Sequence, residues 1–148
     1  MADTTYRDND YSPASLYAGL IGAVLLVAGL IGFFYSASFG SPGNVDAVLG
    51  ILDVNAWHNL IHVASGVLGL LAFTSGPRAS RTYALVFGAV YIVVAIWGFI
   101  IGSHESILGF VPVNTEDNFL HLILGVLGLG AYAVSDPEAE ARTRARAA

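Results

Sequence analysis

The chain has 148 residues, of which 55% are hydrophobic and 11% are charged, and its mean hydropathy is +0.68. Soluble domains carry about a quarter charged residues, so these charges are too few to cover a water-facing surface. A formal net charge of −5 argues against nucleic acid as a partner, and the lack of cysteine excludes disulfides and thiolate metal sites. The composition predicts an integral membrane protein with the lipid bilayer as its main surroundings.

Four apolar stretches are long enough to cross the ~30 Å hydrocarbon core as helices. We expect a polar N-terminal tail over residues 1–15, a four-span membrane domain over 16–134 and a polar, solvated C-terminal tail over 135–148. A cleaved signal peptide is the alternative for the first stretch. The preceding segment is net acidic, however, and the stretch has a relative downstream, so we expect it to be retained. The predicted spans are 16–34, 56–73, 83–101 and 115–134.

The second half of the chain repeats the first. The segment Asn59-x-x-His62-x-x-x-Gly66-Val-Leu-Gly69-Leu returns in the second half, with its histidine at His121. The first and third spans also align with each other, in a register that pairs Tyr17 with Tyr83. Such self-similarity marks a duplicated element. We therefore predict an all-α four-helix bundle made of two parallel two-helix hairpins, over about 16–75 and 82–134, related by an axis along the membrane normal.

The arginines predict the orientation of this bundle. All six basic residues lie in the two tails or in the middle loop, and the two remaining loops have none. The positive-inside rule therefore places both termini in the cytoplasm. Each of the two outer loops, around 45–52 and 104–111, carries an acidic residue followed by apolar residues and Leu-Gly. We expect them to lie on the outer membrane surface or to fold over the mouth of the bundle.

Small and polar residues form one stripe on each histidine-bearing helix, because their spacings alternate between three and four residues. In lipid, helices associate through close packing and interhelical hydrogen bonds, so we expect both stripes to face inward. The predicted packing glycines are Gly22, Gly66, Gly69, Gly88, Gly125 and Gly128. The predicted interhelical polar cluster comprises His58, Asn59, His62, Asp117, Asn118 and His121. This pattern favours a small structural or accessory membrane protein without a cofactor, acting as a homo-oligomer or within a larger membrane complex.

Two cofactor hypotheses are the main alternative. His62 and His121 at matching depths could be the axial ligands of haem b, with the neighbouring glycines leaving room for the macrocycle, as in an electron-transfer subunit. A divalent metal could instead bind at the bundle mouth to His58, His62, His121 and His104, with Asp117 at the position that His58 occupies in the first repeat.

A transporter or channel component is a further alternative, because parallel repeats occur in transporters. No charged residue lies at mid-depth, which argues against a relay across the bilayer. The sequence also shows no nucleophile–base pair and no phosphate loop, so we expect no enzymatic activity.

The motifs resemble those of one known family. Asn-x-x-His-x-x-x-Gly-Val-Leu-Gly-Leu is followed by Tyr-x-x-x-x-Gly-x-x-Tyr from Tyr83 and by Leu-Gly-x-x-Pro-Val-Asn-x-x-Asp-Asn-x-x-His from Leu108. Over residues 16–134 the chain resembles the small four-helix prokaryotic membrane proteins of domain-of-unknown-function family 4383. The resemblance implies the four-span architecture and a plasma-membrane location, but it brings no activity. It marks the motif positions as Asn59, His62, Asp117, Asn118 and His121.

Overall fold

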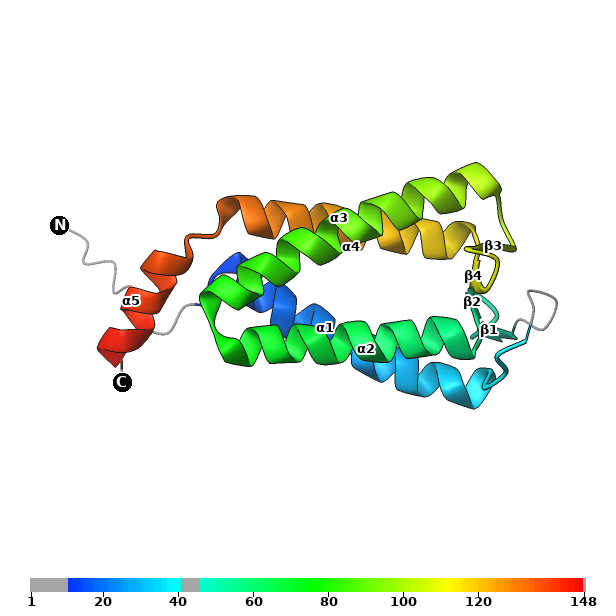
Figure 1. Cartoon of the computed structure of the whole chain (residues 1–148), viewed down its shortest axis with the longest axis horizontal. Helices are drawn as coiled ribbons and strands as arrows, with labels where there is room; N and C mark the ends of the chain where they lie inside the picture. The colour runs from blue at the N-terminus through cyan, green and yellow to red at the C-terminus, as the bar shows by residue number, and fades with distance from the viewer. Residues whose placement is uncertain (1–10, 41–45, 148) are drawn as a thin grey trace.

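The computed structural model describes residues 11–40 and 46–147 and is mostly helical (Figure 1). The four long helices are α1 (Pro13–Tyr35), α2 (Ala56–Ser75), α3 (Pro77–Ile101) and α4 (Thr115–Val134). They run along the long axis of the molecule, with the short helix α5 (Pro137–Ala147) at one end. Two antiparallel hairpins lie at the other end and pair β1 (Asp46–Val48) with β2 (Leu52–Val54) and β3 (Glu105–Ile107) with β4 (Val111–Val113).

All four predicted spans are helices that are long and apolar enough to cross a membrane, which indicates a membrane protein. Two of them begin earlier than predicted. Helix α1 begins at Pro13 because the Ser12 side chain caps it, accepting a hydrogen bond from the Ser15 N–H at 3.2 Å. Helix α3 begins at Pro77, so it includes the arginines that the prediction left in the loop. The predicted N-terminal tail, apart from residues 11–15, lies outside the described residues.

The predicted glycines bring helix backbones into direct contact, α1 against α2 and α3 against α4. A Cβ atom built on Gly22 would lie 2.9 Å from the Leu70 backbone nitrogen and 3.0 Å from the Gly69 carbonyl carbon. A Cβ atom built on Gly88 would lie 2.8 Å from the Leu129 nitrogen and 3.0 Å from the Gly128 carbonyl carbon. No side chain fits between backbones at this separation, so glycine is required at both positions.

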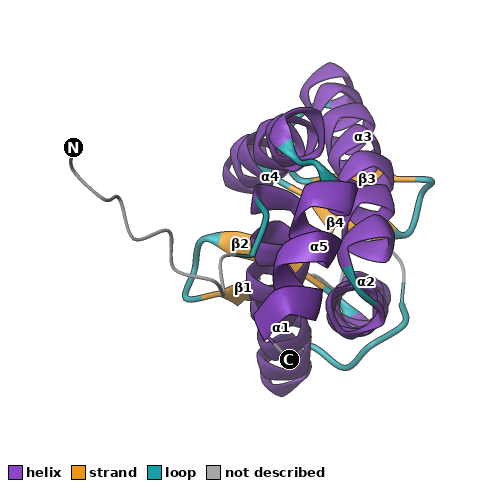
Figure 2. Cartoon of the chain, turned by 90° about the vertical axis from the view of Figure 1, so that its left-hand side faces the viewer, coloured by secondary structure: helices purple, strands orange, loops and turns teal. Residues whose placement is uncertain are grey.

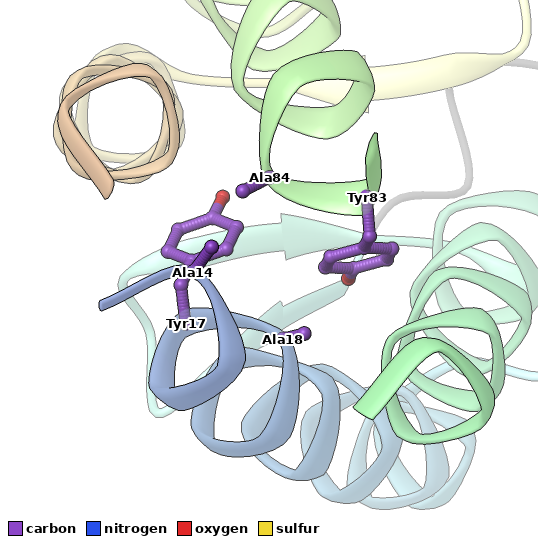
Figure 3. Packing of buried hydrophobic residues seen from close by; sticks show 5 residues of the cluster. All are labelled: Ala14, Tyr17, Ala18, Tyr83 and Ala84. Atoms are coloured by element: carbon purple, nitrogen blue, oxygen red, sulfur yellow. The ribbon is translucent and has the colours of Figure 1, made fainter. Parts of the chain in front are cut away.

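Two tyrosines join the α1–α2 pair to the α3–α4 pair. Tyr17 and Tyr83 lie with Ala14, Ala18 and Ala84 in a buried cluster between α1 and α3 (Figure 3). The Tyr17 hydroxyl donates to the Leu124 carbonyl at 3.0 Å, and the Tyr83 hydroxyl donates to the Ser65 carbonyl at 3.1 Å. Each tyrosine therefore forms a hydrogen bond to a helix of the other pair.

The two outer loops form β-hairpins, which the sequence analysis did not predict. Each turns through a Leu-Gly pair in the left-handed region, with φ of 54° and 71° at Leu49 and Gly50 and of 55° and 77° at Leu108 and Gly109. Positive φ at both central residues is the signature of a tight type I′ hairpin turn. Asparagine amides tie the hairpins together: Asn55 donates to the Phe110 carbonyl at 2.7 Å, and Asn114 donates to the Ile51 carbonyl at 2.6 Å.

The C-terminal segment is a helix that packs across the opposite end of the bundle, in front of the long helices in Figure 2. Glu140 is buried and accepts hydrogen bonds from the Ser15 hydroxyl at 2.8 and 3.0 Å. It also pairs with Arg144, one turn further along α5. The prediction of a merely solvated tail missed this contact, because charge alone gives no sign that one acid of the tail meets the start of α1.

Candidate metal centre

Three histidines from two helices converge beneath the hairpins. His58 and His62 lie one turn apart on α2, and His121 lies on α4. One ring nitrogen from each lies within 4.8 Å of the corresponding nitrogens of the other two. His58 and His121 are buried, and His62 is half-buried. Sequence analysis singled out all three residues, and the structure brings them together as one group.

A backbone contact fixes the ring orientation of His58. Its Nδ1 lies 2.9 Å from the Asp53 carbonyl oxygen, and because a carbonyl can only accept, Nδ1 is the donor. In the neutral ring Nε2 then carries the lone pair and accepts a hydrogen bond from the Nε2–H of His62, 3.1 Å away. This is how metal-binding histidines are held: one ring nitrogen donates to a carbonyl and the other faces the ion.

His121 lies in an unusual environment for a buried polar group. Its Nδ1 atom is fully buried and has no hydrogen-bond partner among the residues that the structure describes. Tyr91 of α3 stacks on the imidazole with 5.4 Å between ring centroids and 23° between planes. Leaving a buried polar atom unpaired costs about 1–3 kcal/mol. Packing against Tyr91 therefore holds the ring in place while its Nδ1 atom lacks a hydrogen bond.

The spacing of the group suits a tetrahedral cation. Zinc–nitrogen bonds of 2.0–2.1 Å in tetrahedral geometry place the ligand nitrogens about 3.3 Å apart. The His58 and His62 Nε2 atoms are already 3.1 Å apart, and the third nitrogen lies within 4.8 Å of both. Small side-chain rotations would therefore bring three imidazoles around one ion and leave a fourth position open.

The asparagines of the predicted polar cluster serve the packing of the helices instead. The Asn59 amide donates to the Ser36 carbonyl at 2.8 Å, which ties α2 to the end of α1. Its side chain fills the space left by Gly32, and Asn118 fills the corresponding space beside Gly98. Both side chains therefore lie where a neighbouring helix comes close, Asn59 against α1 and Asn118 against α3.

Asp117 caps α4. Its Oδ2 accepts from the Asn114 N–H at 3.2 Å and from the Asp53 N–H at 3.1 Å, which joins α4 to the first hairpin. His104 lies apart from the three histidines: its side chain is 74% exposed and its Nδ1 is 2.9 Å from Asp53 Oδ2. The structure does not place His104 in the three-histidine group. The positive φ of 64° at this residue belongs to the loop after α3 and cannot be inferred from spacing.

A cavity of about 220 Å³ adjoins the histidines between α2 and α3, beneath the second hairpin. Apart from the histidines, its polar contributors are Ser65 and Tyr91, and the remaining lining side chains are apolar. Sequence analysis missed Ser65 altogether and recorded Tyr91 only as part of a motif. Ser65 lies seven residues after His58 on α2 and Tyr91 lies on α3, so only the packing of α3 against α2 brings both side chains beside the histidines.

Neighbouring helices fill the space beside Gly66 and Gly125, the glycines that follow the histidines. A Cβ atom on Gly66 would overlap the Leu26 backbone of α1, and one on Gly125 would lie 2.9 Å from the Ile92 nitrogen of α3. The haem hypothesis assigned this space to a macrocycle. In the structure this space holds atoms of α1 and α3.

Comparison with known proteins finds one family. Neither a curated protein nor a solved structure matches the chain. The family described as Domain of unknown function (DUF4383) matches residues 15–134, which include all four long helices except the first two residues of α1, both hairpins and the three histidines. The chain belongs to this family, as the motifs around His62 and His121 predicted.

Proposed function

We propose that the protein binds one divalent transition-metal ion through His58, His62 and His121. The observation that carries the proposal is the convergence of three imidazole nitrogens within 4.8 Å of one another. The carbonyl contact of His58 supports it, because it turns Nε2 toward the other two histidines, and so does the buried Nδ1 of His121, which has no hydrogen-bond partner among the described residues. Imidazole ligands suit zinc, copper, nickel and cobalt, and we propose zinc because three nitrogens with one open position are typical of it.

The setting that we propose is the plasma membrane, with both termini in the cytoplasm and the metal site near the outer surface. The arginine distribution supports this orientation. We also propose that the bundle consists of two hairpin repeats. Gly22 and Gly88, which occupy equivalent positions when Tyr17 is aligned with Tyr83, make matching backbone contacts, and so do the hydroxyls of the two tyrosines.

A structural or accessory role within a membrane complex is the second candidate. It is supported by Gly130 on α4, where an added Cβ atom would meet no described atom within 4 Å. A helix of another subunit could approach closely at such a small residue. The two roles are compatible, and we propose no enzymatic activity for either.

The test is a metal titration of the full chain in lipid nanodiscs, with metal analysis of the same sample. Wild type should bind one zinc ion per chain. Alanine at His58, His62 or His121 should weaken binding at least as much as the 10–100-fold loss typical of outer-shell variants. His104→Ala is the matched control, because this exposed histidine lies outside the group, and it should bind zinc like wild type.

Absence of zinc binding by a folded wild-type protein would reject the proposal and leave the histidines with a packing role. Equal losses in His104→Ala and His121→Ala would also reject it, since binding would then not depend on the three-histidine group.

A further inference from the structure

The cavity beside the three histidines opens on the side of the bundle, between α2 and α3. Ile61 of α2 and Val90 of α3 line it and are 44% and 50% exposed. These side chains face lipid if the bundle spans a bilayer. His62 lies six residues into α2, or about 9 Å below its first residue at 1.5 Å per residue. If α2 crosses the ~30 Å hydrocarbon core along its full length, His58 and His62 lie about 3 and 9 Å inside its outer boundary, and the apolar cavity adjoins them there.

The internal alignment shows that this side of the bundle has specialised. Val90 has an identical equivalent, Val24, in the alignment of the first and third spans. Several other positions of the cavity differ from theirs, and three of them carry polar side chains: His58 corresponds to Asp117, Ser65 to Leu124 and Tyr91 to Leu25. Two of these differences, at Ser65 and Tyr91, place a polar group in the cavity where the aligned position has a leucine. Packing of two hairpins alone gives no reason for polar residues to gather on one side, whereas a ligand site does.

Charge identifies the class of ligand. Three neutral imidazoles leave the full charge of a divalent ion in surroundings of low dielectric, where an anion in the open position is strongly favoured. Among the described residues no acidic side chain lines the cavity: Asp117 is engaged by two backbone N–H groups, and Asp53 faces His104. The anion must therefore come from the ligand, and the apolar walls suit a hydrocarbon chain attached to it.

We infer that the open position of the metal site takes the carboxylate of a single-chain amphiphile, which enters from the membrane with its alkyl chain between α2 and α3. The inference rests on the proposed metal site and names its ligand. In a bilayer a fatty acid holds its carboxylate at the headgroup boundary, within about 9 Å of the histidines. Tyr91 and Ser65 would then border the carboxylate, and Ile61 and Val90 would border the chain.

The experiment uses cobalt as a spectroscopic substitute for zinc in the full chain, held in phosphatidylcholine nanodiscs. Cobalt binding is first measured alone through its visible absorption bands, which respond to coordination number and ligand type. The loaded protein is then titrated with dodecanoate and, separately, with acetate. Dodecanoate should change the bands saturably and at a concentration at least about tenfold lower than acetate, because chain burial adds to carboxylate binding.

Val90→Trp should fill the cavity and weaken the dodecanoate response at least about tenfold while leaving cobalt binding intact. Val24→Trp is the matched control: its side chain is exposed on α1 at the aligned position, outside this cavity, and it should respond like wild type. If Val90→Trp does not fold, Ile61→Trp tests the opposite wall in the same way.

Equal responses to acetate and dodecanoate would overturn the inference, since the open position would then face water and the carboxylate would be bound without its chain. Cobalt bands that neither acid changes would overturn it too. Both outcomes would leave the metal site standing, whereas failure to bind cobalt at all would reject the metal site itself.

Discussion

Alanine in place of Gly22 probes the contact on which the bundle depends. The new Cβ atom would lie 2.9 Å from Leu70 N, 3.0 Å from Gly69 C and 3.1 Å from Gly66 O, all of them backbone atoms. Ordinary carbon contacts need about 3.5–4.0 Å, so α1 and α2 must separate by roughly 0.5–1 Å. Such a gap forfeits a quarter to a half of each dispersion contact along the interface. We expect a loss of about 2 kcal/mol in unfolding free energy, within the usual range for overpacking.

Gly88→Ala should cost the same, because its Cβ atom would meet Leu129 N at 2.8 Å, Gly128 C at 3.0 Å and Gly125 O at 3.2 Å. Gly130→Ala is the control: an added Cβ atom there meets no described atom within 4 Å, so only helix propensity changes, which favours alanine by about 1 kcal/mol or less. Unfolding free energies from denaturant titration in micelles, followed by circular dichroism, compare the three variants. Wild-type stability in Gly22→Ala and Gly88→Ala would refute the close approach of the backbones.

Four further predictions concern the ends of the bundle and the metal. A cysteine at Ser103 should react with an impermeant reagent from outside the cell and one at Ser75 should not; the reverse would overturn the orientation. Glu140→Ala should free α5 from the start of α1 and speed tryptic cleavage of the tail, and an unchanged rate would show that the contact is unimportant. Leu49→Asn should stabilise the protein by roughly 1 kcal/mol, because asparagine tolerates the left-handed region; a loss would mean that the leucine contributes by packing. Zinc at 100 times its dissociation constant should add about 2.7 kcal/mol to stability, and an unchanged melting temperature would argue against native-state binding.

Sequence alone predicts the helices and their contact faces well, because lipid imposes simple requirements on both. A span needs a charge-free stretch of sufficient length, and a close helix pair needs small residues at helical spacing. Gly22 and Gly88 satisfy the second requirement, and both lie against the backbone of the neighbouring helix. The recurrence of His62 as His121 likewise indicated two inward-facing histidines, and both belong to the three-histidine group.

The hairpins escape prediction for a local reason. Strands of three residues are too short for a period of two to be recognised, and tight type I′ turns are usually marked by Asn-Gly or Asp-Gly. Here the turns are Leu49-Gly50 and Leu108-Gly109, with a leucine in a conformation that costs L-residues roughly 1–2 kcal/mol. The asparagines that join the hairpins, Asn55 and Asn114, are recognisable only once the two halves are placed side by side.

The composition of the site was only partly predictable. His58 and His62 lie four residues apart on one helix, so their proximity follows from helix geometry. The exclusion of His104 depends on the path of a loop, and the inclusion of Tyr91 depends on how α3 packs against α4. Neither the exclusion of His104 nor the inclusion of Tyr91 can be predicted from the spacing of residues in the sequence. The cavity is lined in part by residues that differ between the aligned halves, such as Ser65, which aligns with Leu124, and a search for repeated motifs does not find them.

X-ray absorption at the zinc edge of the zinc-loaded protein tests the three-histidine site most directly, because it counts ligands and measures their distances. The proposed site predicts three imidazole nitrogens at about 2.0–2.1 Å and one further light atom. One imidazole should be lost in His121→Ala, and none should be lost in His104→Ala. A first shell with fewer than two imidazoles, or one that His121→Ala leaves unchanged, would contradict a metal centre built from His58, His62 and His121.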